Sequence, residues 1–368
     1  MGGALIIENR GSSDGAARRI RLLIVDDSAV ARAVLARMVS QNPAFEIVDA
    51  VSSAREALAL LERETVDVIL LDIEMPGRTG ISALPDLIDK SRGARVLIVS
   101  ALAEDGAAAT VEALTLGAAD TLAKPGRGTF SGKFSEILCE RLIRLGQSDM
   151  GQGMIRNRAP DHREVPITPA APHIKRGAVA CVAIGASTGG LHAIAEFFKH
   201  LPADFTAPIL ITQHLPAVFM PFFARQIETG SGRRAMVARD GMALEPGLIH
   251  IAPGDAHLCL HRSGDRVFVR LSRVKAVSGC LPSVDPMFVS VADIFGDRAV
   301  GVVLSGMGRD GTIGAADMAA KGAELLAQDV ETSVVWGMPG SIAKAGLATG
   351  VMTPGAIARH IGQRAVRA

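Results

Sequence analysis

The feature that most constrains the fold is a repeated alternation of short aliphatic runs with longer amphipathic segments. In residues 20–146 the runs have the length of buried strands, and the segments between them have the period of helices. The predicted strands are residues 21–25, 45–51, 66–71, 96–100 and 121–123, and the predicted helices are residues 29–39, 54–62, 81–90, 107–116 and 134–145. Five strands alternating with five helices predict a doubly wound, five-stranded parallel sheet.

A second alternation, in residues 177–366, predicts another α/β domain, Rossmann-like and with a mostly parallel sheet. Its predicted strands are residues 179–184, 208–212, 234–238, 248–251, 257–260, 266–269 and 299–304, and its predicted helices are residues 191–199, 217–228, 284–294 and 312–321. Hydrophobic residues make up 48 % of the chain, but aromatic residues only 4 %. Aliphatic side chains must therefore fill both cores, which is typical of parallel sheets covered by helices.

Two stretches fall outside this alternation. Residues 1–19 are rich in Gly and Ser and are expected to be a disordered lead-in, and residues 147–176 break every apolar period and are expected to be a linker. No signal peptide or membrane-length apolar run is evident, so we expect a cytoplasmic chain that is not inserted in a membrane. A formal net charge of +1 argues against a nucleic acid as partner.

Charged and hydroxyl side chains follow or end the predicted strands of the first domain. Asp26 and Asp27 come after the first strand, Asp72 after the third, Ser100 ends the fourth, and Lys124 follows the fifth. Because the carboxyl ends of parallel strands share one edge, these groups are expected to lie together. Carboxylates in such a cluster suit Mg²⁺, and the whole set suits transfer of a phosphoryl group to a carboxylate.

This domain resembles a response-regulator receiver in the motifs LLIVDDSAVAR, LLDIEMPGRTG, VLIVSA and LAKPG. The resemblance implies that Asp72 is the phospho-acceptor and that Asp26, Asp27 and Asp72 hold Mg²⁺. It also implies that Ser100 and Lys124 contact the phosphoryl group. Receivers usually carry an aromatic switch residue three positions before the lysine, where this chain has Thr121.

In the second domain, the first strand runs into a G-x-S-x-G sequence around Ser187 and then into a helix. This setting is that of a nucleophile elbow, although a glycine loop that binds phosphate or caps a helix has the same pattern. A serine nucleophile needs a base, and His214 directly follows the next strand, where it has either a catalytic or a structural role. Asp310 follows the strand at 299–304, where it can orient the imidazole, cap the next helix or do both.

The order Ser, His, Asp differs from that of the common α/β-hydrolases. It matches the catalytic domain of the chemotaxis protein-glutamate methylesterase/glutaminase family, which residues 178–366 resemble in AIGASTGG, ITQHLP, SVDPMFVS, VVLSGMGRDG and VVWGMPG. The resemblance implies that Ser187 is the nucleophile, His214 the general base and Asp310 the orienting acid. It also assigns Thr188 as a supporting hydroxyl and the Met307 amide to the oxyanion hole.

The implied reaction is hydrolysis of glutamate γ-methyl esters, and deamidation of glutamines, on the cytoplasmic helices of chemoreceptors during chemotaxis adaptation. A histidine kinase is the expected phosphodonor, with Mg²⁺ needed for phosphorylation and no cofactor for ester hydrolysis. The receiver is expected to inhibit the hydrolase until it is phosphorylated. Two alternatives stay open: a general esterase coupled to a receiver, and a non-enzymatic response regulator with a protein-binding output.

Overall fold

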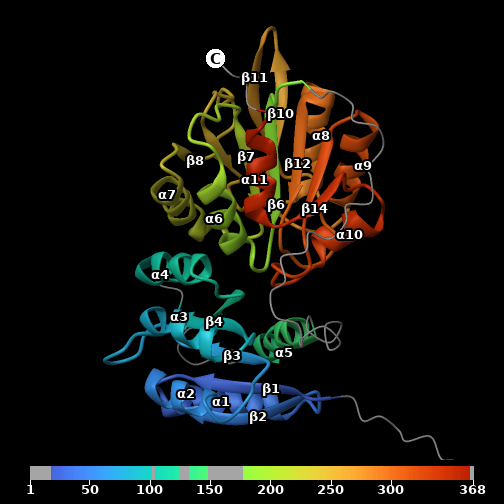
Figure 1. Ribbon diagram of the computed structural model, residues 1–368. Coiled ribbons are helices and arrows are strands. Elements are labelled where there is room, and N and C mark those ends of the chain that lie inside the picture. The colour runs from blue at the N-terminus through green and yellow to red at the C-terminus, as the bar shows by residue number, and fades with distance from the viewer. Residues whose placement is uncertain (1–17, 102–103, 125–131, 148–176, 365–368) are drawn as a thin grey trace, which may run out of the picture.

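The computed structural model describes residues 18–101, 104–124, 132–147 and 177–364, which form two α/β domains (Figure 1). The N-terminal domain lies below the C-terminal domain in this view. Among the helices described, none is both long and apolar enough to cross a membrane.

The N-terminal domain is a five-stranded parallel sheet, as predicted, and its strand order is β2-β1-β3-β4-β5. Its strands are β1 (Ile20–Val25), β2 (Phe45–Val51), β3 (Val68–Leu71), β4 (Arg95–Ala101) and β5 (Asp120–Lys124). Its helices are α1 (Ala29–Ser40), α2 (Ala54–Leu61), α3 (Gly80–Lys90), α4 (Glu104–Thr115) and α5 (Gly132–Gln147). Alternate side chains along each strand enter two apolar clusters, one under α1 and α5 and the other under α2, α3 and α4.

The C-terminal domain has a seven-stranded sheet in the order β14-β13-β12-β6-β7-β9-β8, with every pairing parallel. Its strands are β6 (Cys181–Ala186), β7 (Ile209–Gln213), β8 (Ala235–Val237), β9 (Ile249–Ile251), β12 (Ala299–Val303), β13 (Glu324–Gln328) and β14 (Gly350–Met352). The remaining strands, β10 (His257–Ser263) and β11 (Arg266–Ser272), form a separate antiparallel hairpin. The prediction of a mostly parallel sheet is confirmed, but β13 and β14 were not predicted.

Helices cover both faces of this sheet (Figure 1). They are α6 (Gly190–His200), η1 (Ala217–Phe219), α7 (Met220–Ser231), α8 (Val284–Phe295), η2 (Gly296–Arg298), α9 (Thr312–Ala320), α10 (Met338–Lys344) and α11 (Pro354–Gly362). The prediction missed α10 and α11, and its single helix at 217–228 is divided into η1 and α7. Strand order reverses between β12 and β6, so the carboxyl ends of β6, β7 and β12 border the crevice where open α/β sheets bind ligands.

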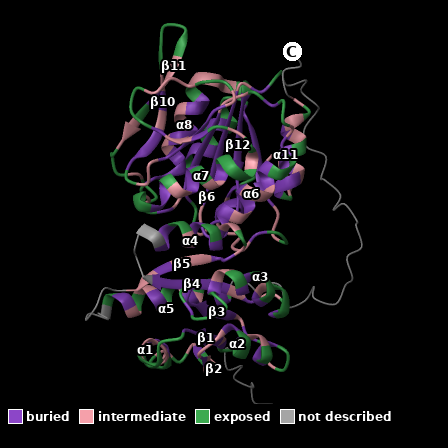
Figure 2. Ribbon diagram, turned by 90° about the vertical axis from the view of Figure 1, so that its left-hand side faces the viewer, coloured by how far each residue is buried: buried purple, intermediate pink, exposed green. Residues whose placement is uncertain are grey.

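The two domains share an apolar contact at this same edge, with α4 and β5 of the first domain facing the second (Figure 2). Helix α4 packs against α6, α7 and η1, and Val111, Leu114, Leu191 and Phe223 belong to one buried cluster. The Gly189 amide donates a hydrogen bond of 2.8 Å to the carbonyl of Ala119, and so joins the turn before α6 to the start of β5. The first domain therefore rests on the crevice of the second.

Candidate active site

Ser187 lies on a tight turn between the fully buried strand β6 and helix α6. Its amide donates to the Ser305 carbonyl at 3.0 Å, which holds the turn against the loop after β12. Gly189 has a φ of +74°, and a Cβ there would lie 2.4 Å from Val334. A Cβ at Gly306 would lie 3.0 Å from that of Ser187. Glycine is therefore required at position 189, a side chain at position 306 would crowd Ser187, and the strand–turn–helix setting predicted for Ser187 is present.

His214 follows β7, the strand next to β6, and its amide donates to the Ala186 carbonyl at 3.1 Å. The imidazole Nε2 lies 2.8 Å from Asp310 Oδ2. Burial lowers the pKa of His214, but the hydrogen bond with Asp310, supported by Cys280, outweighs it and raises the pKa to about 9. Because Nε2 bonds to the carboxylate, Nδ1 is the nitrogen whose lone pair is available in the neutral ring.

Asp310 is buried and fully engaged by hydrogen bonds. Its Oδ1 accepts from Ser283 Oγ at 2.6 Å, and its Oδ2 accepts from the Val284 amide at 2.7 Å in addition to its contact with His214. Burial alone raises the pKa of Asp310, but these hydrogen bonds outweigh it and hold the pKa below its ordinary value. The carboxylate is thus held ionised beside the imidazole.

The hydrogen bonds of Asp310 also settle which helix it caps. Its own helix, α9, has Gly311 at the N-cap position, whereas Asp310 accepts from the first residue of α8. In return, Asp285 in the first turn of α8 accepts from the Gly314 amide in the first turn of α9 at 2.8 Å. Of the alternatives left open for Asp310, a cap of the helix that follows it is not the one present, because the two helices are capped reciprocally, each by an aspartate near the start of the other.

Two residues that the sequence did not single out support Asp310. Ser283 donates to it, and His257 Nδ1 accepts from the Ser283 amide at 2.9 Å. The second ring nitrogen of His257, Nε2, lies 2.8 Å from the Val274 carbonyl and therefore carries the proton. Ser283 stands within the quoted SVDPMFVS motif, but only its contact with Asp310 reveals its place. The sequence around His257 predicts a strand, and that pattern does not indicate a contact with Ser283.

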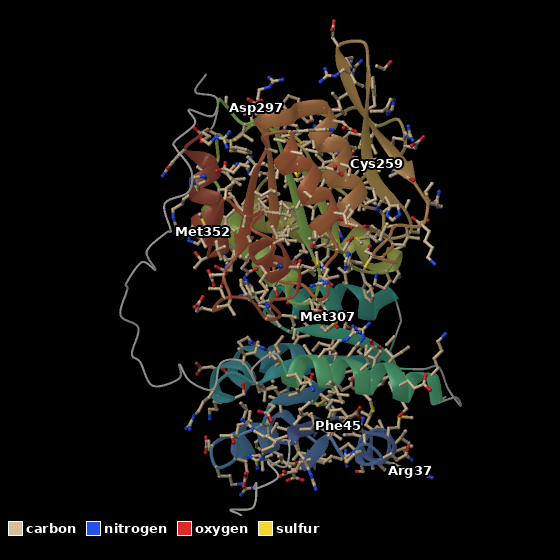
Figure 3. All side chains as sticks on the ribbon, turned by 90° about the vertical axis from the view of Figure 1, so that its right-hand side faces the viewer. Arg37, Phe45, Cys259, Asp297, Met307 and Met352 are labelled. Carbon is tan, nitrogen blue, oxygen red and sulfur yellow. The ribbon has the colours of Figure 1, made fainter. Side chains whose placement is uncertain are left out.

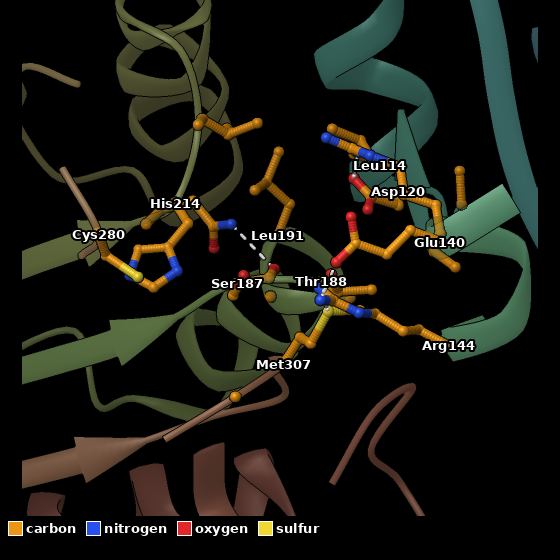
Figure 4. A pocket seen from close by; sticks show the side chains of 18 of the residues that line it. Leu114, Asp120, Glu140, Arg144, Ser187, Thr188, Leu191, His214, Cys280 and Met307 are labelled. Atoms are coloured by element: carbon orange, nitrogen blue, oxygen red, sulfur yellow. Dashed lines mark hydrogen bonds and ion pairs between the residues drawn. The ribbon is translucent and has the colours of Figure 1, made fainter. Parts of the chain in front are cut away.

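Ser187 and His214 line a cavity of about 390 Å³ between the two domains. Figure 4 shows the Cys280 sulfur beside the His214 ring on one side of this cavity and side chains of the first domain on the other. Thr188, Gln213 and Met307 also line it. Among the described residues, no hydrogen bond joins the Ser187 hydroxyl to His214, although both side chains line the same cavity.

The first domain closes the opposite side of this cavity with charged side chains of β5 and α5. Half-buried Asp120 forms an ion pair of 2.8 Å with Arg141, and its removal from solvent raises the pKa of its carboxyl above the ordinary value. Arg144 forms an ion pair with Glu140 and donates to the Met307 sulfur, which lies at the boundary between the domains (Figure 3). Access to Ser187 and His214 is thus restricted by residues that belong to the other domain.

The acidic edge of the first domain has the predicted composition. Ligand atoms of Asp26, Asp27 and Asp72 lie within 4.8 Å of one another, and Lys124 Nζ lies 2.6 Å from Asp72 and 2.8 Å from Asp26. Ser100 is buried near the end of β4, beside β5. Three carboxylates at this spacing supply the oxygen donors that Mg²⁺ prefers, so the residues fit that ion.

The pKa values at this edge follow from burial and pairing. Burial raises the pKa of Asp72 by more than its contact with Lys124 lowers it. Burial also lowers the pKa of Lys124, but its hydrogen bonds with Asp26 and Asp72 outweigh this and raise it. The ammonium therefore stays charged, and its single positive charge is shared between two of the three carboxylates.

Comparison with known proteins identifies both halves. Residues 182–361 match the CheB methylesterase family model, and residues 22–129 match that of the response regulator receiver domain. A Caulobacter vibrioides protein named protein-glutamate methylesterase/protein-glutamine glutaminase 2 is 40 % identical over 349 residues, covering 94 % of this chain and 99 % of that protein. A Rhodospirillum rubrum protein named protein-glutamate methylesterase/protein-glutamine glutaminase 1 is 37 % identical over 364 residues. The match covers 93 % of this chain and 94 % of that protein.

Among solved structures, the catalytic domain of the Thermotoga maritima CheB methylesterase is 35 % identical, with a TM-score of 0.49, covering 50 % of this chain and 98 % of that one. The relatives from Caulobacter and Rhodospirillum extend across both domains and are matched nearly from end to end. The chain therefore belongs to the protein-glutamate methylesterase/protein-glutamine glutaminase family, with a receiver domain preceding the methylesterase domain.

Proposed function

We propose that this chain hydrolyses glutamate γ-methyl esters, and deamidates glutamines, on chemoreceptors, and that phosphorylation of its receiver activates it. The observation that carries the proposal is the His214–Asp310 pair, 2.8 Å apart, in the cavity that also contains Ser187. Membership of the family supports the same reaction, because the relatives are named for both activities. The receiver across the cavity supports control of the reaction by phosphorylation.

In the proposed mechanism, neutral His214 removes the proton of Ser187 at Nδ1 as the serine oxygen attacks the side-chain carbonyl carbon of the substrate. The imidazolium formed is stabilised by Asp310 at Nε2. The tetrahedral intermediate then collapses, and His214 returns the proton to the leaving methanol or ammonia. Water attacks the acyl-enzyme by the same route and releases glutamate, so one site serves both substrates.

The oxyanion of the intermediate needs hydrogen-bond donors that point at the former carbonyl oxygen, where the negative charge develops. We assign the Met307 amide to this role, with the Thr188 hydroxyl as a supporting group, because both residues line the cavity beside Ser187. Helix α6 begins three residues after Ser187, and the positive end of its dipole favours negative charge near the serine. For each of these groups to act, the receiver has to leave the cavity open to a protein side chain.

Phosphorylation at Asp72 is the step proposed to open it. A histidine kinase supplies the phosphoryl group, and Asp26, Asp27 and Asp72 would hold the Mg²⁺ ion that neutralises charge during the transfer. Lys124 and Ser100 would contact the phosphoryl group at the ends of β5 and β4, the strands nearest the second domain. Phosphorylation then shifts a closed population toward an open one, and the gain in activity is limited by the free energy that favours the closed form.

The decisive experiment incubates the full-length protein with a radiomethylated chemoreceptor, with and without a small phosphodonor, and measures volatile methanol. Methanol release that rises with phosphodonor is expected. Ser187→Ala should reduce release on the order of 10⁴-fold or more while the protein stays folded, because a triad member is lost. Near-normal release by the folded variant would rule out Ser187 as the nucleophile. Equal turnover of unrelated small esters and no release from the receptor would favour the general esterase instead.

A further inference from the structure

An exposed aliphatic loop borders the active-site cavity on the side away from the receiver. Eight large hydrophobic side chains are exposed within the described residues, and three of them stand in residues 273–281, here called the rim loop. Val274 is 77 % exposed, Val277 88 % and Leu281 49 %. Such clustering departs from the single scattered apolar side chains of an ordinary surface and is typical of an interaction site.

The rim loop is held in this exposed form by hydrogen bonds of its backbone. The Val274 carbonyl accepts from His257, and the Gly279 amide donates to the Ala276 carbonyl at 3.0 Å. Cys280 donates its amide to Ser278 Oγ at 3.3 Å. The aliphatic side chains therefore face solvent in a defined loop, and a partner that buries them has little ordering to impose.

The rim loop lies beside the cavity that a substrate side chain has to enter. Cys280 lines the cavity beside His214, and in Figure 4 it lies across the cavity from Asp120, Glu140 and Arg144 of the receiver. The rim loop is therefore continuous with the site where a substrate side chain must enter, and the docked receiver leaves it uncovered. It is also linked to that site, because the Val274 carbonyl bonds to His257, the support of Ser283 and Asp310.

The charge of the rim loop indicates what it binds. Its charged residues are Arg273 and Lys275, both exposed, and it contains no acidic residue. Exposed Arg309 stands one position before Asp310 at the same edge. Arg273 pairs with Asp255 at 2.9 Å, but both side chains are more than half exposed to solvent. A surface with an aliphatic centre and basic flanks fits an acidic protein segment that also presents apolar side chains.

We propose that the rim loop is the docking surface for an acidic segment of the substrate protein that surrounds the modified residue. This inference rests on the proposed function and adds where the protein substrate binds. Val274, Val277 and Leu281 bury against apolar side chains of that segment, while Lys275 and Arg309 face its carboxylates. Docking then directs one ester side chain past Cys280 toward Ser187 and His214.

The test compares two exposed valines in the full-length, phosphodonor-treated protein. Val277→Asp places a like charge against the acidic segment, and Val351→Asp is the matched control, since Val351 is 46 % exposed on the distant strand β14. Each variant is assayed on methylated chemoreceptor cytoplasmic domain and on a small glutamyl γ-methyl ester peptide. We expect Val277→Asp to raise KM for the receptor about tenfold or more, as loss of a central contact does, with small-ester turnover unchanged. Val351→Asp should change neither.

Binding of the receptor domain is also measured on the Ser187→Ala background, where Val277→Asp should weaken it without any chemistry. An unchanged receptor KM, or an equal effect of Val351→Asp, would overturn the docking surface. Loss of small-ester turnover in Val277→Asp would also overturn it, because the loop would then act on the chemistry. Self-association that Val277→Asp abolishes would assign the loop to a second copy of the chain. If the unsubstituted protein releases no methanol from the receptor, the proposed function fails, and the binding measurement still decides the docking surface.

Discussion

At the scale of single residues, the reactivity proposed for the site depends on how a buried carboxylate, Asp310, and a half-buried imidazole, His214, share charge. The hydrogen bond between His214 and Asp310 raises the pKa of the imidazole and lowers the pKa of the carboxyl. Asp310 can hold this charge because Ser283 and the Val284 amide also donate to it. The arrangement favours the imidazolium that forms in the transition state, and it keeps the resting imidazole protonated at neutral pH.

The pH dependence of hydrolysis follows from this balance. His214 acts as a base only when it is neutral, and Asp310 raises its pKa to about 9, so kcat/KM on a small ester should rise with pH through that range. Asp310→Asn removes the negative charge and should move the rise to lower pH while reducing the maximal rate. The measurement is a pH–rate profile between about pH 6 and 10 for both proteins. A profile that does not move in Asp310→Asn would show that another group limits the rate.

At the scale of elements, the site depends on the ends of strands and the starts of helices. Strands β6, β7 and β12 end beside one another and deliver the loops that carry Ser187, His214 and Asp310. The starts of α8 and α9 then hold Asp310 in place through the crossed contacts of Asp310 with Val284 and of Asp285 with Gly314. The orientation of the carboxylate is therefore a property of two packed helices as much as of its own loop.

A substitution of Ser283, just before α8, tests whether the helix starts position the Asp310 carboxylate. Ser283→Ala removes the 2.6 Å hydrogen bond to Asp310, so we expect a loss of about 1–3 kcal/mol in the free energy of unfolding and a clear fall in kcat. Ser290→Ala is the control, because Ser290 lies on the same helix and bonds to the Leu260 amide at 3.0 Å, away from Asp310. It should lose comparable stability and keep its kcat. Equal kcat values in the two variants, measured beside urea unfolding, would contradict a positioning role for Ser283.

The strand ends of the receiver carry a separate prediction. Asp72 is buried, is paired with Lys124 and shares its edge with Asp26 and Asp27, so it should be the phospho-acceptor and should require Mg²⁺. Treatment with a small phosphodonor, trapping of the acyl phosphate and mass spectrometry should map the label to Asp72. Label that persists in Asp72→Asn, or forms equally in EDTA, would contradict the assignment.

At the scale of the whole molecule, two chemical sites are separated by one interface. The receiver places α4, β5 and α5 over the cavity, with Asp120 and Arg144 among its walls, while its acidic edge lies at the ends of β1 and β3. Strand β5 connects them, since Asp120 begins it and Lys124 ends it. Thr121, which stands where receivers usually have an aromatic residue, lies between these two, and its carbonyl accepts from Arg141. Phosphorylation of Asp72 would therefore act on Lys124, its partner at one end of β5, a strand whose other end contacts the second domain.

Removal of the receiver should release the hydrolase. A protein that begins at residue 177 lacks every receiver side chain that lines the cavity, and it should be more active than the unphosphorylated full-length chain. Because it lacks Asp72, phosphodonor should leave its rate unchanged. The comparison uses methanol release at equal concentrations, with folding checked by circular dichroism. A slower truncated domain, or a full-length enzyme that ignores phosphodonor, would mean that the receiver serves docking and not inhibition.

The sequence by itself determined the α/β class of both domains and which residues stand at strand ends. Apolar periods are local, and parallel strands bring their carboxyl ends to one edge, so Ser187, His214 and Asp310 could be expected in one crevice. Only the tertiary structure decided that Asp310 caps α8, that His257 and Ser283 stand behind it, and that Asp120 and Arg144 close the cavity. These contacts join residues that are far apart in the chain. Their distances are set by loop conformation and domain packing, which the local pattern of apolar residues does not predict.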